Sequence, residues 1–403
     1  MLYRLKKAGY ESYLVGGGVR DLLLGGKPKD FDVATDALPE QVRELFRNSR
    51  IIGRRFKLVH VRYGREIIEV ATFRSHHEQA ESDDQGLMED GLILRDNVYG
   101  TLEEDAIRRD FTVNALYYNI ADFSVVDFTT GMVDLKSKVL RMIGEVDTRL
   151  QEDPVRMLRA IRFAAKLQFN LEQGLQEQIK LQGERLDMVP AARLFDEVLK
   201  LFMSSHAEQI FLLLRQYKLF PHLFRQTDEY MAESYAEQFV RQGLVNTDRR
   251  IIEEKPVTPA FLFAVLLWPA VKKESDLLHG AGHSHLQSLL EAGRDVIGRQ
   301  IPQVAIPKRF RQMMIDIWVF QARLSQRKGK RPLRLVSHPR FRAAYDFMLL
   351  RNHAGEELQE LCDWWTRFQE VDEGERHLMC KAQGGHKKSR RRRPAKNKPA
   401  GDS

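Results

Sequence analysis

Short apolar runs separated by glycines and polar turns fill the first third of the chain. The runs "YLVGGG", "FDVAT", "KLVHVRYG" and "EIIEVATFR" are typical of strands, and the last two predict a hairpin that turns at residues 63–65. Between them, "GVRDLLLGG" and "LPEQVRELFRNS" have helical spacing, and Pro39 suits a first helical turn. The polar, aperiodic segment 76–91 is expected to be a loop. Thr101, with Glu104 three residues later, predicts a helix start.

From about residue 139 onward the pattern is helical only. In "EDPVRMLRAIRFAAKL", Asp153 can cap a helix and Pro154 fits its first turn. The apolar stripe that this helix would bury consists of Val155, Leu158, Ile161 and Ala165. We therefore predict an α+β protein: a small mixed-sheet head (1–138), a helical neck (139–205), a helical body (206–380) and a basic, disordered tail (381–403).

Charge is concentrated at the C-terminal end. The chain of 403 residues has a formal net charge of +8. Residues 381–403 hold nine lysines and arginines against one acid, Asp402, so residues 1–380 are formally neutral. A tail with so little apolar content cannot bury enough surface to fold alone. Such a tail either increases solubility or tethers a polyanion by releasing counterions from phosphates, and the tether is favoured.

Composition excludes several classes of protein. No apolar run approaches the roughly 20 residues that a membrane span needs, and the start has no secretion signal, so a cytoplasmic location is expected. Cys362 and Cys380 are too few for a disulfide framework and are expected to be reduced. Histidines at 279, 283 and 285 are interpreted as solvated loop residues. Trp364 and Trp365 could stack on bases, but helix core is favoured for at least one of them.

Two aspartates interrupt an otherwise apolar strand pattern. Asp30 and Asp32 stand at i and i+2, so both carboxylates are expected on one side, with Phe31 and Val33 in the core. Two hard oxygen ligands side by side suit a pair of Mg²⁺ ions, which could activate a hydroxyl and stabilise a leaving pyrophosphate. The pair alone is weak evidence, because many surface strands carry one.

A glycine-rich turn precedes these aspartates. Residues 16–18 are all glycine and lie between a predicted strand and a predicted helix, where backbone N–H groups can bind an anion. Arg20 adds a positive charge. The lysine of a P-loop is missing, and Asp21 replaces the third glycine of a dinucleotide fingerprint, so neither of those motifs applies. A glycine turn without a ligand is the alternative.

Four motifs in order identify a resemblance. "LVGGGVRDLLLGGKPKDFDVAT", "EVATFR", "EEDAIRRDFTVNAL" and "EDPVRMLRAIRFAAKL" resemble the class II nucleotidyltransferases of the polymerase-β superfamily. This family comprises bacterial poly(A) polymerases and CCA-adding tRNA nucleotidyltransferases. The resemblance covers about the first 200 residues and implies a polymerase-β-like head. It also implies two Mg²⁺ ions, ATP and RNA 3′ ends as the groups bound.

The resemblance also implies roles for single residues. It assigns Asp30 and Asp32 to the metals, and it assigns the triphosphate to Gly17, Gly18 and Arg20.

A second motif of the resemblance supplies the remaining active-site candidates. Arg109 and Asp110 of "RRDF" are an implied active-site pair, with Asp110 as a third catalytic acid. Glu69, on the strand "EVATFR", is an additional candidate acid. The residues by themselves do not decide between Glu69 and Asp110, and the resemblance favours Asp110.

The helix that begins after Asp153 is implied to select the nucleobase. Asp153 can accept a hydrogen bond from the exocyclic amine of adenine or cytosine, and Arg156 can donate to the adjacent ring nitrogen. Arg159 and Arg162 follow at steps of three and could reach phosphates or brace the pocket. The alternative is an amphipathic helix with a solvated arginine edge.

The choice between adenine alone and CCA rests on residues 51–64. Arg54, Arg55 and Phe56 resemble the poly(A) polymerase version of this stretch, where CCA-adding enzymes are expected to carry a "KHGT"-like turn. The resemblance therefore predicts a template-independent poly(A) polymerase that adds AMP from ATP to RNA 3′ ends and releases pyrophosphate, with RNA-decay proteins as further partners. A CCA-adding enzyme and a catalytically silent RNA-binding protein are the alternatives.

Overall fold

The computed structural model describes residues 1–28, 30–53, 57–75, 86–89, 92–96 and 98–382. The chain divides into two compact units. The first comprises residues 1–229, 244–257 and 299–306, and the second comprises 230–243, 258–298 and the chain from 307 onward. Arg54, Arg55 and Phe56 lie outside the described residues, as does the predicted tail from residue 383 onward.

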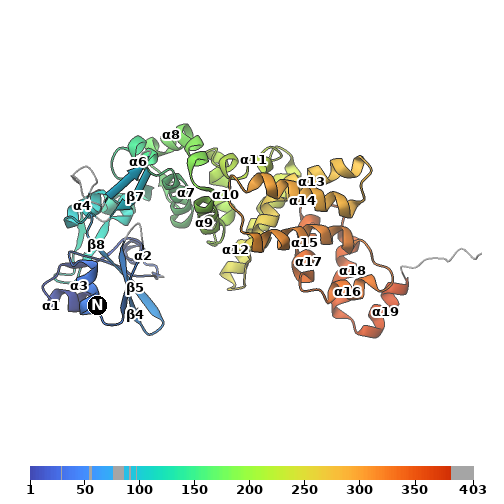
Figure 1. Ribbon diagram of the computed structural model, residues 1–403, viewed down its shortest axis with the longest axis horizontal. Helices are drawn as coiled ribbons and strands as arrows, with labels where there is room; N and C mark the ends of the chain where they lie inside the picture. The colour runs from blue at the N-terminus through green and yellow to red at the C-terminus, as the bar shows by residue number, and fades with distance from the viewer. Residues whose placement is uncertain (29, 54–56, 76–85, 90–91, 97, 383–403) are drawn as a thin grey trace, which may run out of the picture. The chain divides into compact units, whose positions relative to one another are not determined.

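A mixed sheet organises the head (Figure 1). Its strand order is β3-β4-β5-β2-β1-β8-β9. In chain order the bounds are β1 (Ser12–Val15), β2 (Asp32–Thr35), β3 (Ser49–Ile52), β4 (Leu58–Tyr63), β5 (Glu66–Thr72), β8 (Leu116–Asn119) and β9 (Val125–Asp127). β2 and β5 run parallel, whereas the other neighbouring strands run antiparallel. The predicted mixed α/β head is therefore confirmed.

Short helices bury the two faces of this sheet. Leu5 of α1 (Leu2–Lys7) and Val42 of α3 (Pro39–Leu45) belong to one core cluster, together with Val33 of β2. Ala106 of α4 (Leu102–Ile107) belongs to the other. The central strand β2 contributes to both clusters, because Val33 and Ala34 point to opposite faces of the sheet. The remaining helix of the head, α2, spans Gly17–Leu23.

Two local predictions about the head are wrong. Phe31 does not enter the core: it is 39% exposed, because β2 begins only at Asp32 and the alternation of faces does not extend back to it. Within the expected loop 76–91, the segment β6 (Gly86–Glu89) forms a strand that pairs with β7 (Leu92–Asp96). Residues 76–85 lie outside the described residues.

Helices and short 3₁₀ turns continue the first unit beyond the head. Their bounds, with those of two short strands, are η2 (Thr112–Asn114), α5 (Gly131–Ser137), β10 (Val139–Leu140), α6 (Val146–Glu152), α7 (Val155–Leu167), β11 (Asn170–Leu171), α8 (Gln173–Gln182), η3 (Gly183–Met188), α9 (Ala191–Phe202), α10 (Ala207–Gln216) and α11 (Phe220–Asp228). The predicted apolar stripe of α7 is buried at all four positions. The N-cap of α7 is Pro154, one residue later than the predicted Asp153, which instead ends α6 and accepts a hydrogen bond from the Val155 N–H (3.2 Å).

The second unit is helical throughout its described part. It contains most of α12 to α19, whose bounds are α12 (Ser234–Ile252), α13 (Pro259–Gly280), α14 (His285–Gln300), α15 (Lys308–Leu324), α16 (Arg331–Val336), α17 (Phe341–His353), α18 (Gln359–Glu370) and α19 (Glu373–Ala382). Trp365 is fully buried, and Cys362 and Cys380 are buried free thiols, as predicted. The helical body is confirmed.

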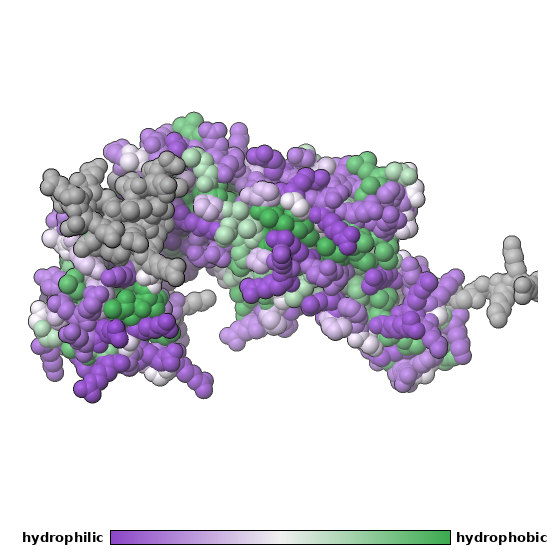
Figure 2. All heavy atoms as spheres, viewed as in Figure 1, coloured by the Kyte–Doolittle hydropathy of each residue, from purple (hydrophilic) through white to green (hydrophobic). Residues whose placement is uncertain are grey.

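Polar residues dominate the visible surface, with smaller apolar patches between them (Figure 2). None of the helices in the described ranges is long and apolar enough to cross a membrane.

Candidate active site

Asp32 and Glu69 lie opposite each other at the centre of the head sheet. They are register partners on the parallel strands β2 and β5, so their side chains share a face. Burial raises the pKa of Asp32 above its ordinary value, and the negative charge of Glu69 raises it further. Arg109 lowers this pKa and Asp30 adds to the increase. Three carboxylates therefore act on one another here, and a cation between them would relieve the repulsion.

A histidine adjoins this acidic group. His60 on β4 is the register partner of Glu69, and its Nε2 lies 3.1 Å from Glu69 Oε1. The contact is half-exposed and holds one oxygen of Glu69 in place. The second oxygen remains able to bind a cation, because a carboxylate has several acceptor positions.

The glycine loop lies directly against the first aspartate. Gly16 has φ +74°, a conformation that glycine adopts without strain, and it is followed by the first turn of α2. A Cβ atom on Gly18 would lie 3.2 Å from the Asp30 carbonyl oxygen, so only glycine permits this approach without displacement. A Cβ atom on Gly17 would lie 3.5 Å from Arg20 Nη2. The glycine loop thus packs closely against both the Arg20 guanidinium and the Asp30 backbone.

Arg109 approaches the loop from the turn that follows α4. Its Nη1 atom lies 3.6 Å from the position of a Cβ on Gly16. Arg109 donates to Asp105 (2.8 Å) and to the Tyr117 hydroxyl (2.8 Å), both of which are buried. Burial disfavours its charge, yet Asp105 more than offsets this and raises the pKa of Arg109. The guanidinium is therefore a fixed positive charge beside the loop and Asp32.

Asp110 turns toward helix α7. Its Oδ1 accepts from the Phe111 N–H (2.9 Å) and from Asn114 Nδ2 (3.3 Å). Its Oδ2 accepts from Arg159 Nε (2.8 Å). Burial opposes ionisation, but Arg159 and these hydrogen bonds hold the pKa of Asp110 below its ordinary value. Both oxygens are thus engaged, Oδ1 within the head and Oδ2 with α7.

The two predicted base-selecting residues have separate partners. Asp153 accepts a hydrogen bond from Arg193 Nη2 of α9 (2.7 Å). Arg156 donates from Nη1 to Glu152 (2.8 Å) and to the Arg149 carbonyl (2.5 Å). Neither contact closes the carboxylate or the guanidinium to a ligand, because each group has further acceptor or donor positions.

Arginines surround the junction of the head with α6 and α7. Burial lowers the pKa of Arg108 and, together with the four neighbouring guanidiniums of Arg74, Arg109, Arg149 and Arg156, brings this pKa to about 9. Burial also lowers the pKa of Arg162, whose Nε is buried without a hydrogen-bond partner in the described part of the chain. Such an excess of positive charge favours binding of a polyphosphate.

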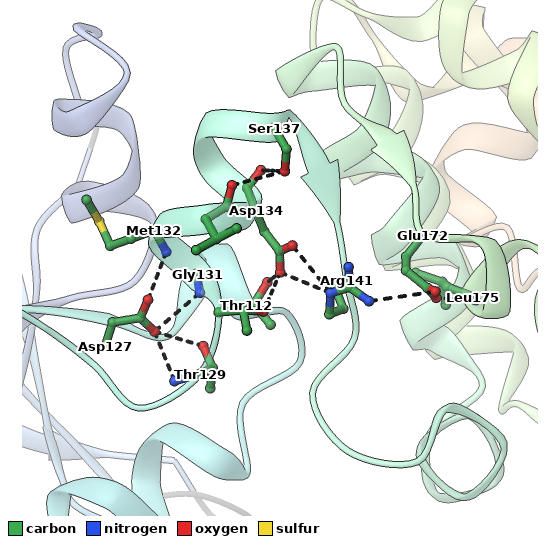
Figure 3. Close-up of polar contacts among 12 residues, drawn as sticks. Thr112, Asp127, Thr129, Gly131, Met132, Asp134, Ser137, Arg141, Glu172 and Leu175 are labelled. Atoms are coloured by element: carbon green, nitrogen blue, oxygen red, sulfur yellow. Dashed lines mark hydrogen bonds and ion pairs between the residues drawn. The ribbon is translucent and has the colours of Figure 1, made fainter.

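A polar network braces the segment that follows the head sheet (Figure 3). Asp127 accepts from the backbone N–H groups of residues 129, 131 and 132 at the start of α5. Asp134 accepts from Thr112 (2.8 Å) and from Arg141 Nε (3.2 Å), and Arg141 Nη1 lies 3.7 Å from Glu172. This network fixes η2, which begins two residues after Asp110.

Sequence reasoning missed several residues of the site: Asp105, Tyr117, Asn114 and Arg193. A signal existed for Asp105, which precedes Arg109 by four residues on a predicted helix and can therefore pair with it. Tyr117 and Arg193 approach from separate elements, so spacing along the chain could not reveal them.

Family models match three segments of this chain. They are described as the poly A polymerase head domain (residues 12–141), the "probable RNA and SrmB-binding site of polymerase A" (168–231) and the polymerase A arginine-rich C-terminus (281–398). Poly(A) polymerase I of Salmonella typhimurium is 48% identical over 99% of this chain and 88% of its own length. The protein of the same name from Escherichia coli O6:H1 is 50% identical over 92% of this chain and 81% of its own.

The chain belongs to the poly(A) polymerase family. CCA-adding enzymes are more distant: that of Lactobacillus helveticus is 40% identical, over 52% of this chain and 51% of its own length. The choice of the poly(A) branch is therefore confirmed, although Arg54, Arg55 and Phe56, on which it partly rested, lie outside the described residues.

Solved structures share the fold at low sequence identity. A tRNA-processing enzyme in an apo form has a TM-score of 0.64 at 22% identity, covering 94% of this chain and 95% of its own. The Thermotoga maritima CCA-adding enzyme complexed with tRNA has a TM-score of 0.61 at 21% identity, covering 96% and 85%. A member of the poly(A) polymerase family thus has the fold of CCA-adding enzymes.

The family implies a divalent metal, and the residues at the sheet centre fit one. They supply hard carboxylate oxygens, which Mg²⁺ prefers, and Asp32 lies close enough to Glu69 and Asp30 for their charges to raise its pKa in addition to burial. Within the described ranges, no group of three or more His, Cys, Asp or Glu side chains is already arranged as a metal site. Asp30 and Asp32, with Glu69 beside them, are the candidate ligands.

Proposed function

We propose that this chain adds AMP from ATP to RNA 3′ ends without a template and releases pyrophosphate. The observation that carries the proposal is the match to poly(A) polymerase I proteins over nearly the whole chain. The juxtaposition of Asp30, Asp32 and the glycine loop supports it, because a nucleotidyl transfer needs carboxylates beside a site for a triphosphate.

Asp30 and Asp32 would hold two Mg²⁺ ions. When bound, these ions supply positive charge that lowers the pKa of the attacking 3′-hydroxyl and stabilises the leaving pyrophosphate. The chain's own contribution is the strand that holds Asp32 and the glycine loop that fixes the backbone at Asp30.

Glu69 is the better-supported third acid. It is the register partner of Asp32 and acts electrostatically on that carboxylate. The family resemblance favoured Asp110 for this role. The Asp110 oxygens already accept hydrogen bonds from Arg159, Asn114 and the Phe111 N–H. We therefore assign the metal-side role to Glu69 and the anchoring of Arg159 to Asp110.

The triphosphate and the base would bind to different elements. Gly17 and Gly18 would contact the phosphates. Arg20, which is 2% exposed and bonded to Asp21 and Asn114, would add positive charge behind the loop, with Arg109 as a second fixed positive charge. Asp153 would accept from the adenine amine.

Further arginines of α7 would act beside Asp153. Arg156 would donate to the adjacent ring nitrogen, since its two observed bonds use Nη1. Arg159 and Arg162 would hold the phosphates close to α7. A guanine or uracil presents a carbonyl where Asp153 needs a donor, and it would be repelled.

RNA would bind along the helical part of the chain. The segment 168–231 matches the family model described as a probable RNA-binding site. The basic residues after 382 would provide sequence-independent grip on phosphates. Promotion of RNA decay, with decay proteins as partners, is the biological role we propose.

An extension assay tests the proposal. Purified protein is supplied with Mg²⁺ and either a generic RNA or a tRNA lacking CCA, each with labelled ATP, with labelled CTP, or with both. We expect long adenylate ladders on the generic RNA and little use of CTP. Addition that stops after CCA on the tRNA would instead indicate the CCA-adding alternative.

Variants separate catalysis from RNA binding. Asp30→Ala is expected to abolish extension and leave RNA affinity unchanged. Asp122→Ala, an exposed position in the β8–β9 turn, is the control and should retain activity. If Asp30→Ala extended RNA normally, the metal assignment would be wrong. If the wild-type protein bound RNA without extending it, the chain would be a catalytically silent RNA-binding protein.

A further inference from the structure

A buried amide connects the glycine-loop arginine to the nucleobase helix. Asn114 ends η2 and is 7% exposed. Its Oδ1 accepts from Arg20 Nη1 at 2.5 Å, and its Nδ2 donates to Asp110 Oδ1 at 3.3 Å. Asp110 in turn accepts from Arg159 of α7. Arg20 is thereby connected to α7 through two side chains.

A second series of contacts leads from Arg20 back to α7 through Asp21. Together the two series form a closed ring of hydrogen bonds and ion pairs. Arg20 Nε donates to Asp21 Oδ1 (2.8 Å), and Lys166 Nζ of α7 lies 3.2 Å from Asp21 Oδ2. Arg159 and Lys166 belong to the same helix, so the ring begins and ends on α7. The Phe163 ring lies inside it, with the Arg20 and Arg159 guanidinium carbons 5.3 and 5.7 Å from its centroid.

Chemistry fixes the orientation of the amide. Arg20 can only donate hydrogen bonds, and ionised Asp110 can only accept them. Asn114 must therefore present its oxygen to Arg20 and its NH₂ group to Asp110. An aspartate has the same shape but no donor, and a leucine has neither group. Among side chains of this length, only an amide both accepts the hydrogen bond from Arg20 and donates one to Asp110.

We propose that Asn114 is a positioning residue that keeps Arg20, which is 2% exposed behind the glycine loop, in register with the base-selecting helix α7. This inference rests on the proposed function, because it concerns how the triphosphate and the base of one ATP molecule are bound at the same time. The triphosphate site is on α2 and the base site is on α7, so a rigid connection allows both to bind without rearrangement. Asn114 itself does not touch the reacting atoms.

Asn114→Asp is the sharpest test, because its effect should depend on pH. The introduced carboxylate would face Asp110 at about the present distance, and two ionised carboxylates so close repel each other. When pH falls, one of them takes up a proton, and the resulting O–H donates where the amide did. The other charged groups facing the pair are the guanidiniums of Arg20, Arg149, Arg159 and Arg162, so the expected change with pH comes from the two carboxyl groups.

The expected readout is a change in the pH profile of kcat/KM for ATP. At pH 8 the variant should lose at least about tenfold, the loss that corresponds to one disrupted buried hydrogen bond to a charged group. The deficit should shrink progressively toward pH 6. Asn119→Asp, at the end of β8 and outside the ring, is the control and should keep the wild-type profile.

A reciprocal exchange provides a second test that does not depend on the single variant folding well. In the double variant Asp110→Asn/Asn114→Asp, the carboxylate accepts from Arg20 and the amide donates to it while accepting from Arg159. The amide nitrogen then replaces Oδ1 and loses the hydrogen bond from the Phe111 N–H, so the expected recovery is partial. We expect kcat/KM at pH 8 to recover relative to Asn114→Asp alone. A loss in Asn114→Asp that is equal at every pH, no loss at all, or a double variant as impaired as the single one would overturn the proposal.

Binding of a fluorescent ATP analogue, measured in parallel, distinguishes this inference from the proposed function. If the wild-type protein fails to extend RNA, the proposed function fails. The pH-dependent loss of analogue binding in Asn114→Asp, relative to wild type, would still report on the ring. If analogue binding and extension both respond to pH as expected, the positioning role and the function stand together.

Discussion

Asp32 shows how a single residue can lower stability for the sake of a site. Burial and the neighbouring carboxylates raise its pKa, so its ionised form is less favourable in the folded protein than in the unfolded chain. This penalty is fully present above the folded-state pKa. It disappears as pH falls below 3.8, the ordinary value, where the group is protonated in both states.

Asp32→Asn should therefore stabilise the metal-free protein while abolishing extension. At pH 7 with a chelator, we expect Tm to rise by about 2–4 °C, the shift that about 1 kcal/mol produces in a domain of this size. The rise should vanish near pH 4. Mg²⁺ should raise the Tm of the wild type but not of the variant. Glu66→Gln, an exposed position on β5, is the control, and a lower Tm for Asp32→Asn at pH 7 would contradict the argument.

Glu69 and Asp110 can be separated by their dependence on Mg²⁺. Glu69→Gln removes a charge beside Asp32, so we expect it to lower kcat by about 10–100-fold and to raise the Mg²⁺ concentration needed for half-maximal activity. Asp110→Asn should raise KM for ATP and leave the Mg²⁺ requirement unchanged, because its partner is Arg159. The reverse pattern would return the third-acid role to Asp110.

At the scale of elements, close packing of two helices requires a glycine at one position of their contact. α14 contacts α15 at Gly293, where a Cβ would lie 2.8 Å from Cε3 of the fully buried Trp318. Five residues along the same helix, a Cβ on Gly298 would meet nothing within 4 Å. The two glycines have the same local structure and different surroundings.

Alanine substitutions should consequently have opposite effects at these two positions. Gly293→Ala overpacks the contact with Trp318 and should reduce the free energy of unfolding by about 1–3 kcal/mol. Gly298→Ala should increase it by up to about 1 kcal/mol, because alanine favours a helix more than glycine does. Thermal or urea unfolding of both variants measures these free energies. Equal effects would show that the Trp318 side chain moves aside without destabilising the protein.

For the whole molecule, the distribution of charge suggests how RNA is retained. Residues 383–403 contain eight of the lysines and arginines, and residues 1–380 are formally neutral. If these residues bind RNA, the affinity should fall strongly as the salt concentration rises, since each neutralised phosphate releases a counterion.

Deleting residues 383–403 should weaken RNA binding and flatten its salt dependence. Each lost phosphate contact should reduce the slope of log affinity against log salt by about 0.7 for single-stranded RNA. Titrations at several salt concentrations measure the slope. A full-length variant with those eight residues replaced by glutamine should match the deletion. An unchanged slope would place RNA binding elsewhere in the chain.

Much of the architecture could be predicted from local patterns. The hairpin of β4 and β5, the capping box at Thr101 and Glu104, and the buried stripe of α7 all depend on contacts a few residues apart. Prediction failed at Phe31, because the sequence does not say where a strand begins. It failed at residues 86–89 as well, because pairing with β7 overrode a polar composition.

The sequence by itself determined the family, the order of the motifs and the identity of Asp30, Asp32 and the glycine loop, because these are short and contiguous. Only the tertiary structure decided which groups meet. It placed Glu69 opposite Asp32 through parallel pairing of β2 with β5, and it joined Arg20 to Asp110 through Asn114. Strand pairing and buried hydrogen bonds connect residues far apart in the chain, and no local pattern records those partners.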